Sequence, residues 1–305
     1  MLKKVLFISP IIVIALLMVD IAICFVYPDI SSLKKENPSK TSFMEFREKE
    51  WANEGIDKTI SQKWVPLKRI SPYLIKAVII AEDDKFWRHE GFDFAAMEQA
   101  LKKDLKKRRF KAGGSTISQQ LAKNLYLSPS KNPIRKIKEA ILTWRMERTL
   151  SKRRIVEIYL NVAEWGDGIF GIEAASRHYF GKHASALSAQ EASRLATVLP
   201  NPRVYNVNGD SRYIRNRSAR IYKIMVSRGI VIPEFEEVMK PPEETAPDTE
   251  EDFSSVAGTS GIEPTSVEDA QQIGSQGNAP GSATPDQPEA ALPDAGTENS
   301  SNPAP

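Results

Sequence analysis

An acidic cluster in the stretch EDDKFWRHEG, residues 82–91, contains the first candidates for acid–base chemistry. An apolar run, YLIKAVIIA, leads into it, and Ser71 followed by Pro72 predicts the start of a helix that continues to Ala81. Glu82 would then lie at the negative end of the helix dipole, with like charge beside it from the two following aspartates. Both effects raise the pKa of a carboxylic acid, which suits a general base or acid. A solvated acidic cluster beside a core aromatic is the simpler interpretation.

A second candidate is the stretch KAGGSTISQQLAKN, residues 111–124. Thr116 and Gln119 have the spacing of a capping box, which predicts the start of a helix. A helix N-terminus offers free N–H groups to an anion. Gln120, Lys123 and Asn124 follow at spacings of three and four and therefore share one face. A capped helix with a surface lysine is the alternative interpretation.

A third candidate is NPIRKIKEAILTWRMERTL, where Asn132 and Pro133 predict the start of a long helix through Leu150. Arg135 and Glu139 are separated by four residues. They form either a surface ion pair, worth tenths of a kcal/mol, or a phosphate clamp in which Glu139 orients Arg135, and spacing alone leaves both open. The basic run LKKDLKKRRFK, residues 101–111, is either a solvated helix end and loop or a contact for lipid phosphates.

The sequence also predicts helices for the elements that must position these residues. Apolar residues recur at helical spacing at Phe94, Met97, Leu101 and Leu105. Ser188 and Glu191 have capping-box spacing, and the helix that they open should stop at LPNP, residues 199–202. No convincing alternating strands are visible, so the sequence predicts a mainly α domain.

The N-terminal segment, residues 5–27, is almost wholly apolar. As a helix its 23 residues would extend roughly 34 Å, enough to cross a hydrocarbon core. The preceding Lys3 and Lys4 predict a cytoplasmic N-terminus, with the remainder outside the membrane. A cleaved signal peptide is the alternative. The single cysteine, Cys24, lies in this segment, so the exported part would fold without disulfides.

The C-terminal segment has the opposite composition. It has no Lys or Arg after Lys240 and carries 13 acidic residues from position 243 onward, among many Pro, Gly, Ser and Thr, which predicts disorder. The preceding part of the chain therefore holds 42 basic and 26 acidic residues, a net charge of +16. A domain with such a high positive charge at a membrane is expected to bind anionic lipids or a phosphate-bearing substrate. The predicted compartment makes nucleic acid an unfavoured partner.

Four motifs in this order, EDDKFWRHEG, GGSTISQQLAKN, RKIKEAILTWRMERTLSKRRIVEIYLN and GIFGIEAA, resemble those of the family 51 glycosyltransferases, the peptidoglycan transglycosylases. The stretch YLNVAEWGDGIFGIEAASRHYFGK and the later LPNP are similar to the monofunctional biosynthetic branch. The resemblance extends over roughly residues 60–225. Class A penicillin-binding proteins share this module, but we expect no transpeptidase domain here, and the acidic tail lies outside the family pattern.

The resemblance implies a lysozyme-like, mainly α fold behind a single N-terminal transmembrane helix, with a membrane-facing small lobe. We expect a cytoplasmic N-terminus and anchor (1–27), a linker and membrane-proximal segment (28–60), a glycosyltransferase domain (61–240) and a disordered acidic tail (241–305). The enzyme would lie in the bacterial inner membrane with its catalytic domain outside the cytoplasm.

The substrate implied by the resemblance is lipid II, a disaccharide-pentapeptide on undecaprenyl pyrophosphate. Glu82 matches the glutamate that deprotonates the acceptor 4-hydroxyl, which attacks C1 of the donor sugar with inversion and expels the lipid pyrophosphate. Glu139 matches the second catalytic glutamate. The expected substrate-binding residues are Lys123 and Arg135 at the pyrophosphate, Ser115, Thr116, Gln120 and Asn124 as substrate contacts, and Asp83, Phe86 and His89, which shape the first motif.

The expected partners are lipid II, the growing glycan chain, membrane lipids and other cell-wall synthesis or division proteins, with no nucleic acid. No protein metal site is expected, and a divalent cation, Mg²⁺ or Mn²⁺, at the pyrophosphate is left open. Two alternatives to this function are a lysozyme-like glycan-cleaving enzyme and a catalytically idle cell-wall scaffold. A glycan-cleaving enzyme needs no pyrophosphate clamp, so Lys123 and Arg135 discriminate against it.

Overall fold

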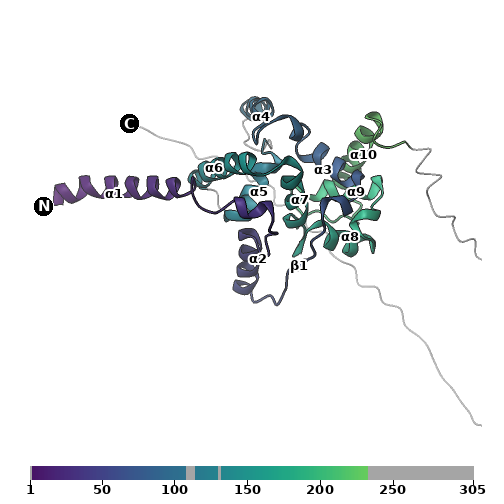
Figure 1. The fold of residues 1–305 in the computed structure, drawn as a ribbon, viewed down its shortest axis with the longest axis horizontal. Coiled ribbons are helices and arrows are strands. Elements are labelled where there is room, and N and C mark those ends of the chain that lie inside the picture. Colours follow the sequence, from purple (N-terminus) through teal and green to yellow (C-terminus); the bar gives the residue numbers. More distant parts are fainter. Residues whose placement is uncertain (1, 108–113, 130–131, 233–305) are drawn as a thin grey trace, which may run out of the picture. The chain divides into compact units, whose positions relative to one another are not determined.

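The computed structural model describes residues 2–107, 114–129 and 132–232, with side chains described from position 11 and, in the first range, to position 102. All these residues belong to one structural unit of the chain. The fold is mainly helical, as predicted (Figure 1). The helices are α1 (Leu2–Ile23), α2 (Ser42–Asn53), α3 (Pro72–Glu82), α4 (Phe94–Lys107), α5 (Ile117–Tyr126), α6 (Pro133–Thr149), α7 (Lys152–Val162), α8 (Ile172–Phe180), α9 (Ala189–Val198) and α10 (Arg212–Ser227). Short 3₁₀ turns lie at Ser31–Lys34, Leu67–Arg69, Phe86–Arg88 and Ala184–Ala186.

Most helix starts follow from local sequence. The capping boxes predicted at Thr116 and Ser188 are both present, and the Asn132 side chain accepts a hydrogen bond of 2.9 Å from the backbone N–H of Ile134. Ser71 is the exception. It precedes α3, but its hydroxyl donates to the carbonyl of Leu187 at 2.8 Å and does not cap the helix. Pro72, with its fixed φ, therefore starts α3 without a side-chain cap.

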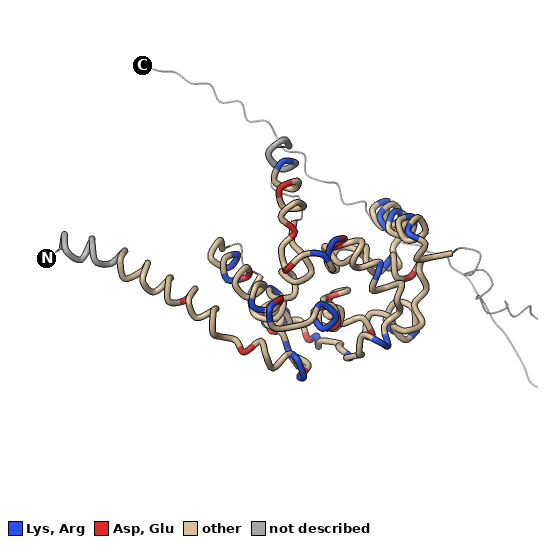
Figure 2. Tube along the Cα trace, turned by 45° about the horizontal axis from the view of Figure 1, so that its top comes forward, with Lys and Arg blue, Asp and Glu red and all other residues tan. Residues whose placement is uncertain are grey.

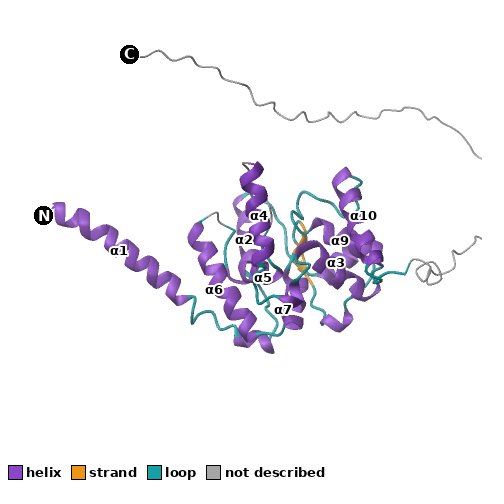
Figure 3. Cartoon of the chain, turned by 90° about the horizontal axis from the view of Figure 1, so that it is seen from above, coloured by secondary structure: helices purple, strands orange, loops and turns teal. Residues whose placement is uncertain are grey.

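No convincing alternating strands were visible in the sequence, but three short strands form one small sheet in the order β1–β3–β2 (Figure 3). They are β1 (Ser61–Gln62), β2 (Glu164–Gly166) and β3 (Ile169–Phe170), with β3 parallel to β1 and antiparallel to β2. Strands of two or three residues are too short to show alternation. The chain leaves β3 through Gly171, whose φ is 77° and where an added Cβ would lie 2.6 Å from the carbonyl oxygen of Asn161. Only glycine fits there.

The core positions the end of α3. Three of its side chains, Leu74, Ala77 and Val78, are fully buried, and the helix packs against α9 and α10. A second group forms where α5 packs against α2, α6 and α7. Because α3 is held along its length, its last residue, Glu82, has a fixed place between these two groups.

The helical spacing predicted for residues 94–105 is confirmed by α4, but its apolar side chains face outward: Phe94 is 74% exposed and Leu101 54%. The side chain of Leu105 and residues 108–111 of the basic run lie outside the described residues, as do residues 241–305 of the predicted tail.

Within the residues that the structure describes, no helix is both long and apolar enough to cross a membrane. The predicted anchor, residues 5–27, is therefore not confirmed, and its side chains up to position 10 lie outside the described part. The C-terminal end of this segment is bound to α6. The guanidinium of Arg145 donates to the carbonyls of Cys24, Val26 and Pro28 at 2.9, 3.0 and 2.9 Å, and the Lys138 ammonium lies 2.6 Å from the Asp20 carboxylate.

Candidate functional site

Glu82 ends α3 with a side chain that is only 10% exposed. Its Oε2 accepts a hydrogen bond of 2.9 Å from the amide of Gln120 on α5. Its Oε1 has no hydrogen-bond partner within the described structure and lies 3.7 Å from the guanidinium of Arg217 on α10. Burial raises the pKa of Glu82, while Gln120, Arg217 and Lys123 lower it. The predicted direction is confirmed, but burial is the main cause, and Asp83 adds less.

The amide of Gln120 is held in one orientation. Its Oε1 accepts a hydrogen bond of 3.0 Å from the hydroxyl of Tyr159 on α7, which leaves the NH₂ group toward Glu82. Tyr159 is fully buried, and burial raises its pKa well above the ordinary value, so this hydroxyl stays protonated. Glu82 therefore keeps a neutral donor on one oxygen and a cation beside the other.

The next acid, Asp83, joins the first motif to α5. It is 7% exposed and accepts hydrogen bonds from Nε2 of His89 at 2.8 Å and from the backbone N–H of Ile117 at 3.0 Å. Because Nδ1 of His89 accepts from the N–H of Gly91 at 3.1 Å, the ring proton lies on Nε2 and is donated to Asp83. The first N–H of α5 therefore donates to Asp83 and is not available to a substrate anion.

Gly91 explains the glycine at the end of the first motif. Its φ is 91°, and an added Cβ would lie 2.9 Å from side-chain atoms of both Thr143 and Glu147 on α6. Its carbonyl accepts a hydrogen bond of 2.7 Å from the hydroxyl of Thr116. The first motif is therefore packed closely against both α5 and α6.

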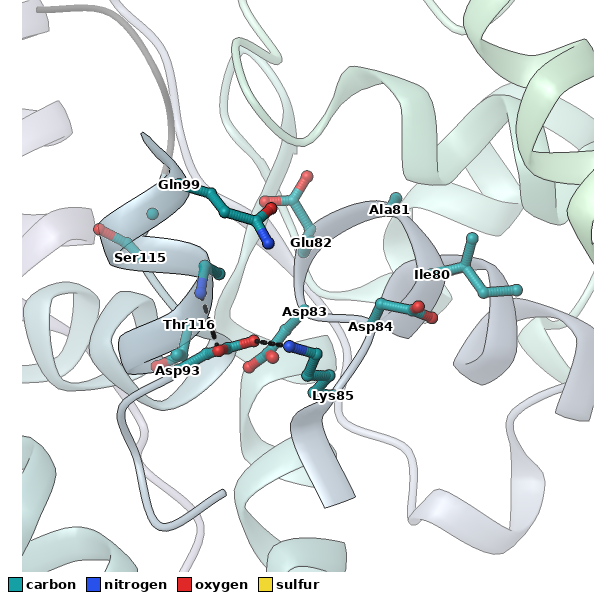
Figure 4. A pocket seen from close by; sticks show the side chains of 12 residues that line it. Ile80, Ala81, Glu82, Asp83, Asp84, Lys85, Asp93, Gln99, Ser115 and Thr116 are labelled. Carbon is teal, nitrogen blue, oxygen red and sulfur yellow. Dashed lines mark hydrogen bonds and ion pairs between the residues drawn. The ribbon is translucent and has the colours of Figure 1, made fainter. Parts of the chain in front are cut away.

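The third acid of the cluster, Asp84, lies apart from the other two. Figure 4 shows the side chains of Glu82, Asp83 and Asp84 leaving the end of α3 in different directions. Asp84 is half-exposed and pairs with both guanidinium nitrogens of Arg228, at 2.5 and 2.9 Å. That hydrogen bonding lowers the pKa of Asp84. Asp83 and Asp84 are therefore both paired. Glu82 differs from them because it is buried and its Oε1 has no hydrogen-bond partner in the described structure.

A cavity of about 330 Å³ adjoins Glu82 between α3, α4 and the start of α5 (Figure 4). Its walls carry more carboxylates than ammonium groups. The lining residues are Ile80, Ala81, Glu82, Asp83, Asp84, Lys85, Asp93, Ala96, Gln99, Gly114, Ser115 and Thr116.

Lys123 lies one turn beyond Gln120 on α5. Among the described residues its ammonium has no hydrogen-bond or ion-pair partner. Burial lowers its pKa, Glu139 and Glu82 act in the opposite direction, and Arg135 lowers it further. With Gln120 and Asn124 it lines a cavity of about 180 Å³. A buried cation that is not neutralised is suited to an anionic ligand.

Arg135 and Glu139 do not form an ordinary surface pair. The Glu139 side chain is 3% exposed, and its Oε2 lies 3.1 Å from the guanidinium of Arg135. Its Oε1 is paired with the ammonium of Lys136, which also lies 3.4 Å from the hydroxyl of Ser115. Glu139 thus holds two cations at the start of α6, near the end of the loop that carries Ser115.

The predicted residues divide into those that line the cleft and those beneath it. Phe86 is fully buried, packs on Trp87 with ring centroids 5.0 Å apart, and lies under the ammonium of Lys152 at 4.5 Å. Phe86 and His89 shape the first motif and do not line the cavity beside Glu82. The remaining predicted residues line one of the two cavities or belong to the Glu139 cluster, and these are Glu82, Asp83, Ser115, Thr116, Gln120, Lys123, Asn124, Arg135 and Glu139.

Three residues of the site were missed from the sequence. Lys136 follows Arg135 directly and could have been found from the RK pair, since spacings of three and four both reach Glu139. Tyr159 lies within the third motif, but nothing local indicated its role, and Arg217 lies outside the quoted motifs. Both reach the site only because α7 and α10 pack beside it. In the described part of the chain, no group of His, Cys, Asp and Glu side chains could hold a metal ion.

The model of the Transglycosylase family matches residues 49–226 of the chain. A biosynthetic peptidoglycan transglycosylase from Nitrosospira multiformis is 48% identical over 194 residues, which cover 64% of this chain and 84% of that protein. The proteins of the same name from Dechloromonas aromatica and Aromatoleum aromaticum are 50% identical over 185 residues and 58% identical over 169 residues. These alignments cover 61% and 55% of this chain, and 80% and 74% of the two relatives.

Proposed function

The chain belongs to the family of biosynthetic peptidoglycan transglycosylases and is a peptidoglycan glycosyltransferase, and we propose that Glu82 is the base of its glycosyl transfer. The acceptor is lipid II, whose sugar 4-hydroxyl is a very weak acid and needs a base in the transition state. The observation that carries this role is the Glu82 carboxylate itself, buried beside a cavity with Oε1 free of hydrogen bonds within the described structure.

In this mechanism Oε1 takes the proton of the acceptor hydroxyl while the hydroxyl oxygen attacks C1 of the donor sugar. The bond from C1 to the lipid pyrophosphate breaks, and the new β-1,4 linkage forms with inversion. Gln120 holds Oε2 at 2.9 Å, so the carboxylate cannot rotate freely. The Arg217 guanidinium, 3.7 Å from Oε1, favours the anionic form that accepts the proton.

The departing pyrophosphate is stabilised by Lys123, Arg135 and Lys136. Lys123 supplies an ammonium that has no partner within the described part of the chain, and Glu139 orients the other two cations. These groups compensate charge as it develops on the leaving group. The cluster offers nitrogen donors and a carboxylate that is already paired, which does not fit a divalent cation held by the protein, so no step is assigned to Mg²⁺ or Mn²⁺.

The other site residues are supported by arrangement and by charge. Ser115, Thr116 and Asn124 serve as substrate contacts because they line the two cavities beside Glu82 and Lys123. Asp83 and His89 join the first motif to α5.

Residues 5–27 anchor the enzyme in the bacterial inner membrane, with the N-terminus in the cytoplasm and the catalytic domain outside it. The composition of the segment supports this role, and so do the side chains described in α1, among which Ile11, Leu16 and Met18 are more than 60% exposed. The domain boundaries at residues 27, 60 and 240 are part of the same proposal, as are contacts with membrane lipids and other cell-wall proteins.

The test of the function is incubation of the purified full-length protein with lipid II, followed by separation of products by chain length. Glycan strands of increasing length, with release of undecaprenyl pyrophosphate, are the expected result. Shortening of preformed glycan would instead identify a cleaving enzyme, and the absence of any reaction would identify an idle scaffold.

A further inference from the structure

A basic hollow on α10 lies next to the proposed catalytic carboxylate, and apart from Arg217 its residues have no part in the mechanism above. It is open, has a volume of about 470 Å³, and is lined by Arg212, Tyr213, Asn216, Arg217 and Arg220. Figure 2 shows Lys and Arg recurring along this helix. Arg217 forms both a wall of the hollow and the contact to Oε1 of Glu82 at 3.7 Å. Only the side chain of Arg217 would therefore separate a ligand in the hollow from the carboxylate of Glu82.

Two of the three arginines of the hollow have no carboxylate partner in the part of the chain that the structure describes. Within the described residues, neither Arg212 nor Arg220 has a carboxylate partner, and both are exposed. Arg215, on the same helix but outside the hollow, is paired with Asp210 at 2.5 Å. Among the described residues, no acid lines the hollow, whereas Asp83, Asp84 and Asp93, with a single lysine, Lys85, line the cavity on the other side of Glu82. An anionic group beside Glu82 is therefore favoured on the α10 side.

The hollow also has an aromatic wall. The rings of Tyr213 and Tyr205 are stacked with centroids 4.0 Å apart at an interplanar angle of 15°. Both residues are half-buried, and only Tyr213 lines the hollow, since Tyr205 lines a separate cavity. The Tyr213 ring, supported by Tyr205, is a surface against which the apolar face of a sugar or peptide side chain can pack at little entropic cost. Arginines beside an aromatic surface are suited to a ligand that has carboxylates on a partly apolar framework.

We propose that this hollow binds the stem peptide of the acceptor lipid II through its carboxylates. This inference rests on the proposed function, because the acceptor is the substrate whose hydroxyl must reach Glu82. The two oxygens of Glu82 face different helices, Oε2 toward α5, which carries Lys123, and Oε1 toward α10. A donor whose pyrophosphate lies at Lys123 leaves the α10 side to the acceptor. Arg212 and Arg220 would bind peptide carboxylates, and Tyr213 would pack against the framework.

The test uses a soluble disaccharide-pentapeptide without lipid or pyrophosphate, and the same compound with its peptide carboxyl groups amidated. We expect the full-length protein to bind the acid form about tenfold more tightly than the amide, and the double variant Arg212→Ala, Arg220→Ala to lose this difference. Arg215→Ala is the matched control, because it removes a cation from α10 outside the hollow. Tyr213→Ala should weaken both compounds equally. With lipid II, the double variant should raise KM about tenfold and leave kcat within twofold.

Equal binding of acid and amide by the wild type would overturn the inference, as would an equal loss in Arg215→Ala. If the arginine variants weaken binding of inorganic pyrophosphate and leave the disaccharide-pentapeptide unaffected, the hollow is a phosphate site and the inference is wrong. These binding measurements need no turnover. A wild type that binds the acid form selectively but does not polymerise lipid II would contradict the proposed function and not the hollow.

Discussion

The two oxygens of Glu82 have different surroundings, and this difference defines its chemistry. Oε2 is held by the neutral amide of Gln120, and Oε1 is buried beside the Arg217 cation without a hydrogen-bond partner in the described structure. Burial raises the pKa of the acid, which strengthens it as a base, and Arg217 limits that rise, which keeps it ionised. A base for a sugar hydroxyl needs both effects at once.

Glu82→Gln should therefore abolish polymerisation while the fold and lipid II binding stay nearly unchanged. The amide has the shape of the acid but cannot accept the proton, and the loss of a general base typically costs about 10²–10⁴-fold. Product formation, thermal melting and lipid II binding are measured together. Asp210→Asn is the matched control, since Asp210 is exposed, pairs with Arg215 and lines neither cavity of the site. Turnover by Glu82→Gln near that of the wild type would remove Glu82 from the mechanism.

The pH profile of kcat should have an acidic limb above the ordinary pKa of a glutamate, 4.5, because the pKa of Glu82 is raised. The active form is the anion, so the rate falls as the pH drops through this raised value. Arg217→Ala removes a cation that lowers the pKa, and the limb should move to higher pH. Arg217→Lys should move it back in part. A limb that stays in place in Arg217→Ala would show that the 3.7 Å contact has no influence on ionisation.

Lys123→Ala and Arg135→Ala should each stay folded and lose about 10²–10³-fold in turnover, the usual loss when a group that stabilises developing charge is removed. Arg135→Lys should recover only part, because an ammonium cannot form the bidentate contact with a phosphate. Lys76→Ala, which removes an exposed lysine of α3, is the control. Lipid II consumption measures the loss of turnover, and thermal melting shows whether each variant is still folded. A glycan-cleaving enzyme has no pyrophosphate to expel, so unimpaired folded variants would support that function instead.

At the scale of elements, a buried ion pair joins the first part of the fold to the sheet. The guanidinium of Arg47 on α2 contacts the carboxylate of Glu164 on β2 at 2.9 Å, and their side chains are 12% and 3% exposed. Burial raises the pKa of Glu164, and Arg47 opposes this rise. The two residues are 117 positions apart, so the pair fixes long-range packing.

Arg47→Ala should lower the free energy of unfolding by about 3–5 kcal/mol, because it leaves a buried carboxylate without its partner. Lys40→Ala, which removes only the exposed pair between Lys40 and Glu48, should cost at most about 1 kcal/mol. Chemical denaturation of both variants gives the comparison. Equal costs would mean that the buried pair contributes no more than a surface pair.

The elements differ in how far local sequence could predict them. The starts of α5, α6 and α9 were readable, because a cap and its partner lie within three residues of each other. The sheet was not readable, since it depends on pairing between residues 61–62 and 169–170. The same limit applied to the site. Motif residues on α3, α5 and α6 could be named individually, but Tyr159 and Arg217 reach them only through the packing of α7 and α10.

At the scale of the whole molecule, α6 contacts two different parts of the protein along its length. Its first turn carries the Arg135, Lys136 and Glu139 cluster, and its later turns bind the end of the proposed anchor through Lys138 and Arg145. A rigid helix thus links the proposed membrane segment to the groups that would receive a lipid pyrophosphate. The clamp and the proposed anchor are consequently held in one fixed relation.

Truncation after Lys240 should leave polymerisation of lipid II largely intact. The removed segment has no Lys or Arg and little apolar material, so it cannot contribute a packed core. The family match ends at residue 226, and Arg228, which binds Asp84 beside the site, is retained. We expect turnover within about twofold of the full chain and an unchanged melting temperature. A second truncation, after Arg220, is the control, because it removes the last turns of α10 together with Arg228 and should destabilise the fold. A large loss of activity in the first truncation would show that the acidic tail has a role in catalysis.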